Sequence, residues 1–225
     1  MLFRKPISKC EVINDFDGNL MNFWTQVRDH HTELIDSFRY LPASREVFES
    51  YKTKYQNSDY ADDLERAHIY YYINRICFGG DMKGPCFGTS KRVPSTYRPD
   101  KLATDIEAAF QRIQKVLIEN KNFADIIRRY DCKDTFFCID PPYRNAKQYA
   151  VGQFTDEQYV QLHECCKNIQ GKCLITLNND EFIRRVFSDF NLIDHKVAYK
   201  ICRDTAGRRE FGELIITNYD VGEVM

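Results

Sequence analysis

The sequence predicts an α/β fold in which strands and helices alternate around a mostly parallel sheet. Two observations support this prediction. Residues 136–139 and 173–177 are short apolar runs, each suited to a strand buried on both faces. One helical pattern lies between them, so strand, helix and strand follow within about forty residues, as in a βαβ unit with parallel strands.

The composition is that of an ordinary globular protein. The 225 residues are 43% hydrophobic and 29% charged, which suits one domain, or one domain with an inserted lobe. The formal net charge is −1, so contacts with nucleic acid need a local basic patch. We find no signal peptide and no apolar run long enough to span a bilayer, and we therefore expect no membrane partner.

The cysteine pattern argues against two kinds of site. The nine cysteines include no Cys-x-x-Cys pair, and Cys165 and Cys166 are adjacent. A zinc ribbon or a disulfide framework would need other spacings. We expect reduced, partly buried thiols, a cytoplasmic location and no bound metal.

The first predicted strand covers residues 10–13 and ends at Asn14 and Asp15. An acidic residue at the end of the second strand of a Rossmann-like sheet can hold a ribose diol. Alternatively, Asp15 caps the following helix, although Asp17 is the better cap candidate because Gly18 follows it.

A polar, tyrosine-rich region with helical character follows. Apolar spacing predicts a helix over residues 20–30, and Ser44 is typical of a helix start within the region from 32 to about 75. The tyrosines at 70–72 could stack on bases, but core packing with a solvated hydroxyl group is their commoner role.

Residues 78–99 predict a long loop, because they show no regular period and are rich in glycine, proline and serine. No acidic residue lies between Asp81 and Asp100, whereas several basic residues do. These are Lys83, Lys91, Arg92 and Arg98. They could contact DNA phosphates, with Phe87 or Tyr97 stacking on bases or inserting between them. The alternative is a solvated surface loop.

The remaining elements follow from local patterns. Residues 102–119 carry apolar residues at helical spacing. Thr155 and Gln158 resemble a capping box and predict a helix that ends at Gly171. The last two strands, near 196–202 and 213–219, should form an antiparallel hairpin.

The first buried run ends at Asp140, Pro141, Pro142 and Tyr143, where open α/β sheets bind their ligands. The Asp140 carboxylate and the Pro141 carbonyl could accept both hydrogens of an adenine amino group and free its lone pair. Proline fixes φ and adds no competing N–H. Tyr143 could stack on a base flipped out of the duplex. The alternative is an ordinary Asp-Pro turn.

The segment Asp140–Tyr143 resembles the catalytic motif of S-adenosylmethionine-dependent amino-methyltransferases, and its aspartate form implies adenine as the target. Three further segments resemble the Dam-like DNA adenine methyltransferase family of phages and restriction systems. They are residues 12–15, 73–80 and 213–219. The resemblance implies a Rossmann-like methyltransferase sheet with a helical insertion, S-adenosyl-L-methionine as cofactor and double-stranded DNA as partner.

The same resemblance implies individual roles. Asp15 would hold the ribose of the cofactor, Phe123 would pack against its adenine, and Asp140 would lie against both cofactor and target. Asn122 stands where the family often has an acidic residue. Asn74 and Arg75 lie in a matching segment and would contact DNA together with the basic loop.

The implied organisation is a methyltransferase core of residues 1–31 and 119–225 with a DNA-recognition insertion at 32–118. The family normally begins with a glycine-rich turn of the type Phe-x-Gly-x-Gly, which this sequence lacks together with the first strand. We expect an impaired enzyme that an upstream fragment could complement. Alternatives are an inactive DNA-binding remnant, an accessory subunit of a split enzyme, or methylation of RNA or protein.

Overall fold

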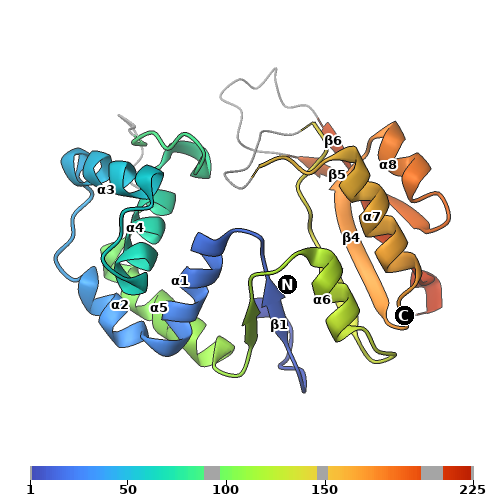
Figure 1. Ribbon diagram of the computed structural model, residues 1–225, viewed down its shortest axis with the longest axis horizontal. Coiled ribbons are helices and arrows are strands. Elements are labelled where there is room, and N and C mark those ends of the chain that lie inside the picture. Colours follow the sequence, from blue (N-terminus) through green and yellow to red (C-terminus); the bar gives the residue numbers. More distant parts are fainter. Residues whose placement is uncertain (1, 89–96, 146–151, 199–209, 224–225) are drawn as a thin grey trace. The chain divides into compact units, whose positions relative to one another are not determined.

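A computed structural model describes residues 2–88, 97–145, 152–198 and 210–223 (Figure 1). The chain folds as two compact units, and the division falls between Lys121 and Asn122. We call them the N-terminal and the C-terminal unit. Residues 2–31 share a unit with the helices of the predicted insertion, so the assignment of 32–118 to DNA recognition stays a prediction.

The N-terminal unit combines helices with a small parallel sheet. Strand β1 (Val12–Asn14) pairs with β2 (Leu117–Glu119), with Val12 opposite Leu117. The helices are α1 (Gly18–Asp29), α2 (His31–Ser37), α3 (Arg45–Asn57), α4 (Asp63–Ile76) and α5 (Pro99–Ile113), and 3₁₀ turns occupy Leu2–Arg4 and Phe78–Gly80.

The helix starts in this unit confirm the sequence analysis. Asp17 caps α1 by accepting hydrogen bonds from the amides of Asn19 and Leu20. Ser44 caps α3 by accepting one from Val47. Because a capping side chain satisfies backbone amides within three residues, the sequence carries this signal locally.

The predicted helix over 102–119 is too long. Helix α5 ends at Ile113, and Leu117 belongs to β2. The Leu117 amide donates to the Glu11 carbonyl at 2.9 Å, and the parallel pairing with β1 continues from there. Strand pairing thus overrides an apolar spacing that fits a helix equally well.

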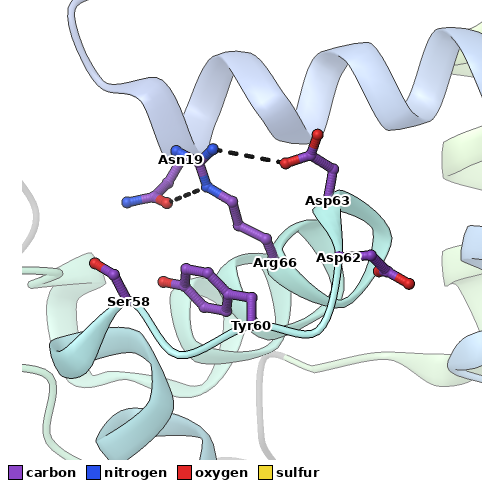
Figure 2. A pocket seen from close by; sticks show the side chains of 6 residues that line it. All are labelled: Asn19, Ser58, Tyr60, Asp62, Asp63 and Arg66. Atoms are coloured by element: carbon purple, nitrogen blue, oxygen red, sulfur yellow. Dashed lines mark hydrogen bonds and ion pairs between the residues drawn. The ribbon is translucent and has the colours of Figure 1, made fainter.

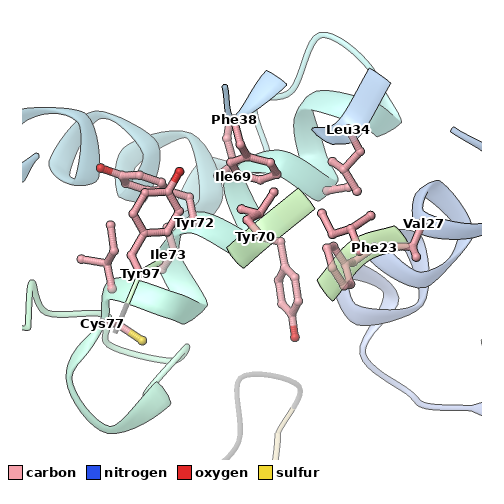
Figure 3. Close-up of a cluster of buried hydrophobic side chains, with 14 of the residues drawn as sticks. Phe23, Val27, Leu34, Phe38, Ile69, Tyr70, Tyr72, Ile73, Cys77 and Tyr97 are labelled. Atoms are coloured by element: carbon pink, nitrogen blue, oxygen red, sulfur yellow. The ribbon is translucent and has the colours of Figure 1, made fainter. Parts of the chain in front are cut away.

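Aromatic and aliphatic side chains together fill the core of the N-terminal unit (Figure 3). Tyr70 and Tyr72 of α4 are buried, which confirms core packing as their role. The Tyr72 hydroxyl donates to the Pro42 carbonyl at 2.8 Å and accepts from the Ser44 amide at 3.0 Å. Its polar end is therefore satisfied by protein atoms, not by water.

The C-terminal unit is a four-stranded sheet of order β3-β4-β6-β5. Its strands are β3 (Phe136–Ile139), β4 (Lys172–Asn178), β5 (Asn191–Ala198) and β6 (Glu210–Thr217), its helices are α6 (Phe123–Tyr130), α7 (Asp156–Lys167) and α8 (Glu181–Val186), and a 3₁₀ turn occupies Val221–Glu223. Strands β3 and β4 run parallel around α7, and β5 and β6 pair antiparallel, as predicted. The bounds differ: β5 begins at Asn191 instead of near 196 and β6 at Glu210 instead of near 213, and residues 199–202 of the predicted strand lie outside the described residues.

Helix α7 lies along β4 in Figure 1 and starts with the predicted capping box of Thr155 and Gln158. Its apolar face packs on one face of the sheet, where Ile175 and Leu177 are fully buried. The expectation that residues 136–139 are buried on both faces is wrong for the described residues. Phe136 is 48% exposed, and burial alternates along β3, with Phe136 and Cys138 exposed and Phe137 and Ile139 half-buried, because successive side chains of a strand point to opposite faces of the sheet.

Candidate active site and nucleic-acid contacts

Asp140 directly follows β3, at the carboxyl end of the parallel pair β3 and β4. The Thr176 hydroxyl of β4 donates to Asp140 Oδ1 at 2.6 Å. The parallel register places Ile139 opposite Ile175, so Thr176 stands one residue further along, beside the carboxylate. One oxygen of an exposed carboxylate is thereby held in place at the sheet edge.

Pro142 and Tyr143 are also held by neighbouring elements. The hydroxyl group of Tyr159, a fully buried residue of α7, donates to the Pro142 carbonyl at 2.6 Å. The half-buried Tyr143 packs against the core of the C-terminal unit. An ordinary exposed Asp-Pro turn needs no such supports, so their number favours a positioned site.

Asp15 directly follows β1 and is half-buried. Its Oδ1 accepts the Asp17 amide at 2.8 Å, and its backbone carbonyl accepts a bond from Asn120 at 2.8 Å. Burial raises the pKa of the Asp15 carboxyl group. Since Asp17 caps α1, the capping alternative for Asp15 is wrong, whereas its ribose role stays a prediction.

Phe123 is the first residue of α6 and packs against Phe154, with ring centroids 5.5 Å apart. Asn122 caps this helix by accepting the Ala124 amide at 2.9 Å. Asparagine is a favoured cap, which gives a local reason for that residue. The contact of Phe123 with a cofactor adenine stays a prediction.

The described residues proposed for DNA contact are all exposed. Asn74 and Arg75 end α4, and the Arg75 guanidinium lies 5.2 Å from the centre of the Tyr71 ring. Lys83 lies in a turn, and Arg98 pairs with Asp100 at 2.9 Å. The other two predicted residues, Lys91 and Arg92, lie outside the described residues.

Phe87 and Tyr97 do not serve as exposed stacking rings. Phe87 is half-buried against Phe48, with centroids 5.4 Å apart, and Tyr97 is 4% exposed and packs against Tyr72. Both rings pack against the core, because burial of their apolar surface is more favourable than its exposure to solvent.

A polar pocket of about 660 Å³ opens beside the start of α1 (Figure 2). Its lining includes Asn19 and Arg66, joined by a 2.8 Å hydrogen bond, and Arg66 also lies 3.8 Å from Asp63. Acidic and basic groups thus offset each other in its wall. None of the predicted catalytic residues lines this pocket.

Comparison of the chain with known protein families identifies its family. The family model of the D12 class of N6 adenine-specific DNA methyltransferases matches residues 3–201. The chain belongs to this family. Family membership indicates a DNA adenine N6 methyltransferase, with DNA as substrate and, in general, S-adenosylmethionine-dependent chemistry.

Relatives of this D12 methyltransferase are similar at low identity over most of their length. The Type II methyltransferase M.CviBI of Paramecium bursaria Chlorella virus NC1A is 23% identical over 84% of this chain and 73% of its own length. The Type II methyltransferase M1.LlaDCHI of Lactococcus lactis subsp. cremoris is 23% identical over 97% of this chain and 82% of its own length. The DNA adenine methylase of Salmonella typhi is 22% identical over 91% of this chain and 77% of its own length.

Sequence reasoning missed the side chains that hold the candidate site of this D12 methyltransferase, above all Thr176 and Tyr159. Thr176 lies 36 positions from Asp140, and only the strand register brings the two together. Tyr159 lies in the helix predicted from the capping box, and its hydroxyl group gives no sequence signal of its partner. Within the described ranges, no cluster of three or more metal-binding side chains occurs, and no helix is long and apolar enough to cross a membrane.

Proposed function

We propose that this chain transfers a methyl group from S-adenosyl-L-methionine to N6 of adenine in double-stranded DNA, with Asp140, Pro141, Pro142 and Tyr143 at the reacting centre. The observation that supports this most is the carboxylate of Asp140, held by Thr176 at the end of a parallel strand. This is the place and the chemical group that activation of an amino group requires.

In this mechanism the bound cofactor supplies an electrophilic methyl group. Asp140 accepts one hydrogen bond from the adenine amino group, and the Pro141 carbonyl accepts the other. These bonds draw the nitrogen toward tetrahedral geometry and localise its lone pair for attack. When the amino nitrogen takes the methyl group, the sulfur–methyl bond of the cofactor would break with its electron pair staying on sulfur, and the nitrogen would release a proton to the Asp140 carboxylate. Tyr143 stacks on the flipped base and holds its plane.

Cofactor and DNA contacts extend this proposal. The half-buried carboxylate of Asp15 at the end of β1 suits a ribose diol, and Phe123 supplies an aromatic face for the adenine. Exposed Asn74, Arg75, Lys83 and Arg98, with Lys91 and Arg92, would contact DNA, mainly at phosphates, from the recognition segment 32–118. The DNA substrate and the free thiols support a cytoplasmic location.

We also propose that the chain works better with an added glycine-rich segment. Within the described residues, β1 pairs only with β2, and β3 pairs only with β4, so each strand has an open edge. An upstream fragment ending in Phe-x-Gly-x-Gly could add a strand there and supply a turn for the methionine part of the cofactor. An inactive remnant or accessory subunit would bind DNA but would show no binding of S-adenosyl-L-methionine and no turnover of its own.

The test is transfer of labelled methyl groups to unmethylated duplex DNA, with and without the glycine-rich fragment, together with calorimetric titration of S-adenosyl-L-methionine. We expect weak binding and slow transfer for the chain alone, and an increase in both with the fragment. Asp140→Ala should abolish transfer while the protein stays folded. Unchanged turnover in Asp140→Ala, or preferential labelling of RNA or protein, would contradict the proposal.

A further inference from the structure

Arg144, the residue directly after Tyr143, is anchored through both its backbone and its side chain. Its amide donates to Asn178 Oδ1 of β4 at 2.9 Å. Its guanidinium binds Asp156 in a bidentate manner, with Nε–Oδ1 at 2.8 Å and Nη2–Oδ2 at 3.1 Å. The remaining nitrogen, Nη1, lies 3.2 Å from Asp180 Oδ2. Every nitrogen of the guanidinium therefore has a carboxylate partner.

These partners belong to different elements of the C-terminal unit. Asp156 is the first residue of α7, and Asp180 is the cap of α8, where it also accepts the Phe182 amide at 2.8 Å. The guanidinium also lies 4.7 Å from the centre of the Phe182 ring. One side chain thus connects the end of the catalytic segment to the starts of two helices.

The anchor lies beside a turn in the backbone. Asn145 has a φ of +61°, a left-handed conformation within the turn at residues 144–145. Upstream, the supports are the bonds to Asp140 Oδ1 and to the Pro142 carbonyl. Tyr143 lies between these supports and the turn, and the anchored Arg144 holds the backbone on its downstream side.

We infer that Arg144 is a positioning residue for methyl transfer: it fixes the backbone that presents Tyr143 and the adjacent prolines to the target base. This inference rests on the proposed function of residues 140–143. Lysine cannot replace it, because one ammonium group cannot bind Asp156 through two parallel hydrogen bonds and reach Asp180 as well.

A positioning role and an architectural role of Arg144 differ in how they affect turnover. A purely architectural ion pair would affect turnover only through the fraction of folded protein. A positioning residue affects the rate of the chemical step in folded protein, because displacement of a reacting group by about 1 Å can cost on the order of 100-fold in rate.

The test compares Arg144→Ala and Arg144→Lys with a matched control, Arg128→Ala. Arg128 lies in the same unit, on α6, and its exposed pair with Asp125 at 3.4 Å lets the control remove the same charge. Hydrogen exchange of the peptide covering 137–145, the urea midpoint, and kcat and KM for duplex DNA are measured for each protein, with and without the glycine-rich fragment.

We expect Arg144→Ala to accelerate exchange in 137–145 about tenfold and to lower kcat about 10- to 100-fold at unchanged cofactor affinity. Arg144→Lys should fold like the parent yet remain slow, and Arg128→Ala should match the parent in every measurement. Asp140→Ala should lose turnover in the folded protein, because it removes an acceptor for the amino hydrogens.

Equal exchange in the Arg144 and Arg128 variants would overturn the positioning role. So would a loss of turnover that only follows the unfolded fraction. A parent without turnover in every combination would contradict the proposed function instead, and the exchange comparison would still support or overturn the anchoring of this segment by Arg144.

Discussion

Removal of the Arg112 guanidinium should destabilise the N-terminal unit by about 3 kcal/mol. Its Nη1 lies 2.6 Å from Glu11 Oε2, and its Nη2 lies 2.9 Å from Glu11 Oε1 and 2.8 Å from the Leu2 carbonyl. One side chain of α5 therefore holds the residue before β1 and the N-terminal 3₁₀ turn.

The size of the expected loss of stability follows from the burial of the Glu11 and Arg112 side chains. The Glu11 side chain is 6% exposed and that of Arg112 is 14% exposed. Removing one partner of a buried ion pair costs about 3–5 kcal/mol, because the other charge stays buried and uncompensated. Lys5 and the Ser8 amide also bind the Glu11 carboxylate, so the lower end of this range applies.

The assay is urea unfolding of Arg112→Ala followed by the fluorescence of Trp24. This residue is the single tryptophan of the chain, and it packs against Phe3 and Phe23 in the same unit. Arg39→Ala is the control, since its pair with Asp36 is largely exposed and should contribute less than about 1 kcal/mol.

Acid titration provides a second readout. Hydrogen bonding to Arg112, supported by Lys5 and opposed by burial, lowers the pKa of Glu11 to about 2. The unfolded chain then takes up this proton at higher pH than the folded chain does. The contribution of the Glu11 carboxylate to the free energy of unfolding is therefore complete above the ordinary glutamate pKa, and it is lost as the pH falls toward about 2.

Two results would refute this reasoning. The first is a decrease in the free energy of unfolding of Arg112→Ala that is no larger than the decrease in Arg39→Ala. The second concerns the double variant with Glu11→Gln and Arg112→Met, which leaves no buried charge and should recover part of the loss. A double variant as unstable as the sum of the single variants would mean that the two side chains are not coupled.

Three further predictions address other parts of the chain. Thr176→Val removes the bond to Asp140 and should lower kcat about tenfold with little change in the urea midpoint, whereas Thr176→Ser should keep most of the rate. Burial lowers the pKa of His68 to about 4, so the unfolded chain takes up this proton at a higher pH than the folded chain. The free energy of unfolding of the N-terminal unit should therefore fall by up to about 3 kcal/mol between pH 6.5 and about 4. The acid titration of His68→Gln should lack this loss. Neutralising Lys91 and Arg92 together should weaken DNA binding for all sequences and flatten its salt dependence, and an unchanged salt slope would exclude phosphate contacts at both residues.

The features predictable from the sequence were those whose partners lie close by in the chain. Asp17, Ser44 and Thr155 each bind an amide within three residues, so the cap is visible in a short stretch of sequence. The parallel unit around α7 was predictable for a similar reason, since its strands and helix are consecutive.

Features that depend on distant partners were not predictable. Leu117 became a strand residue because it meets β1, more than one hundred positions away. Thr176 reaches Asp140 through the register of β3 and β4, and apolar runs carry no register information. The candidate catalytic segment at residues 140–143 could be proposed from its own residues, but the side chains that support it could not.

In the part of the chain that the structure describes, β3 pairs on one side only, with β4, and this open edge has a consequence for the behaviour of the purified protein. Its outer row of amide and carbonyl groups, beside the exposed ring of Phe136, is a template on which another extended chain can form hydrogen bonds. At high concentration a second molecule can occupy this edge. We therefore expect light scattering to rise with concentration, and Phe136→Lys, which places a charge beside the edge, to suppress the rise.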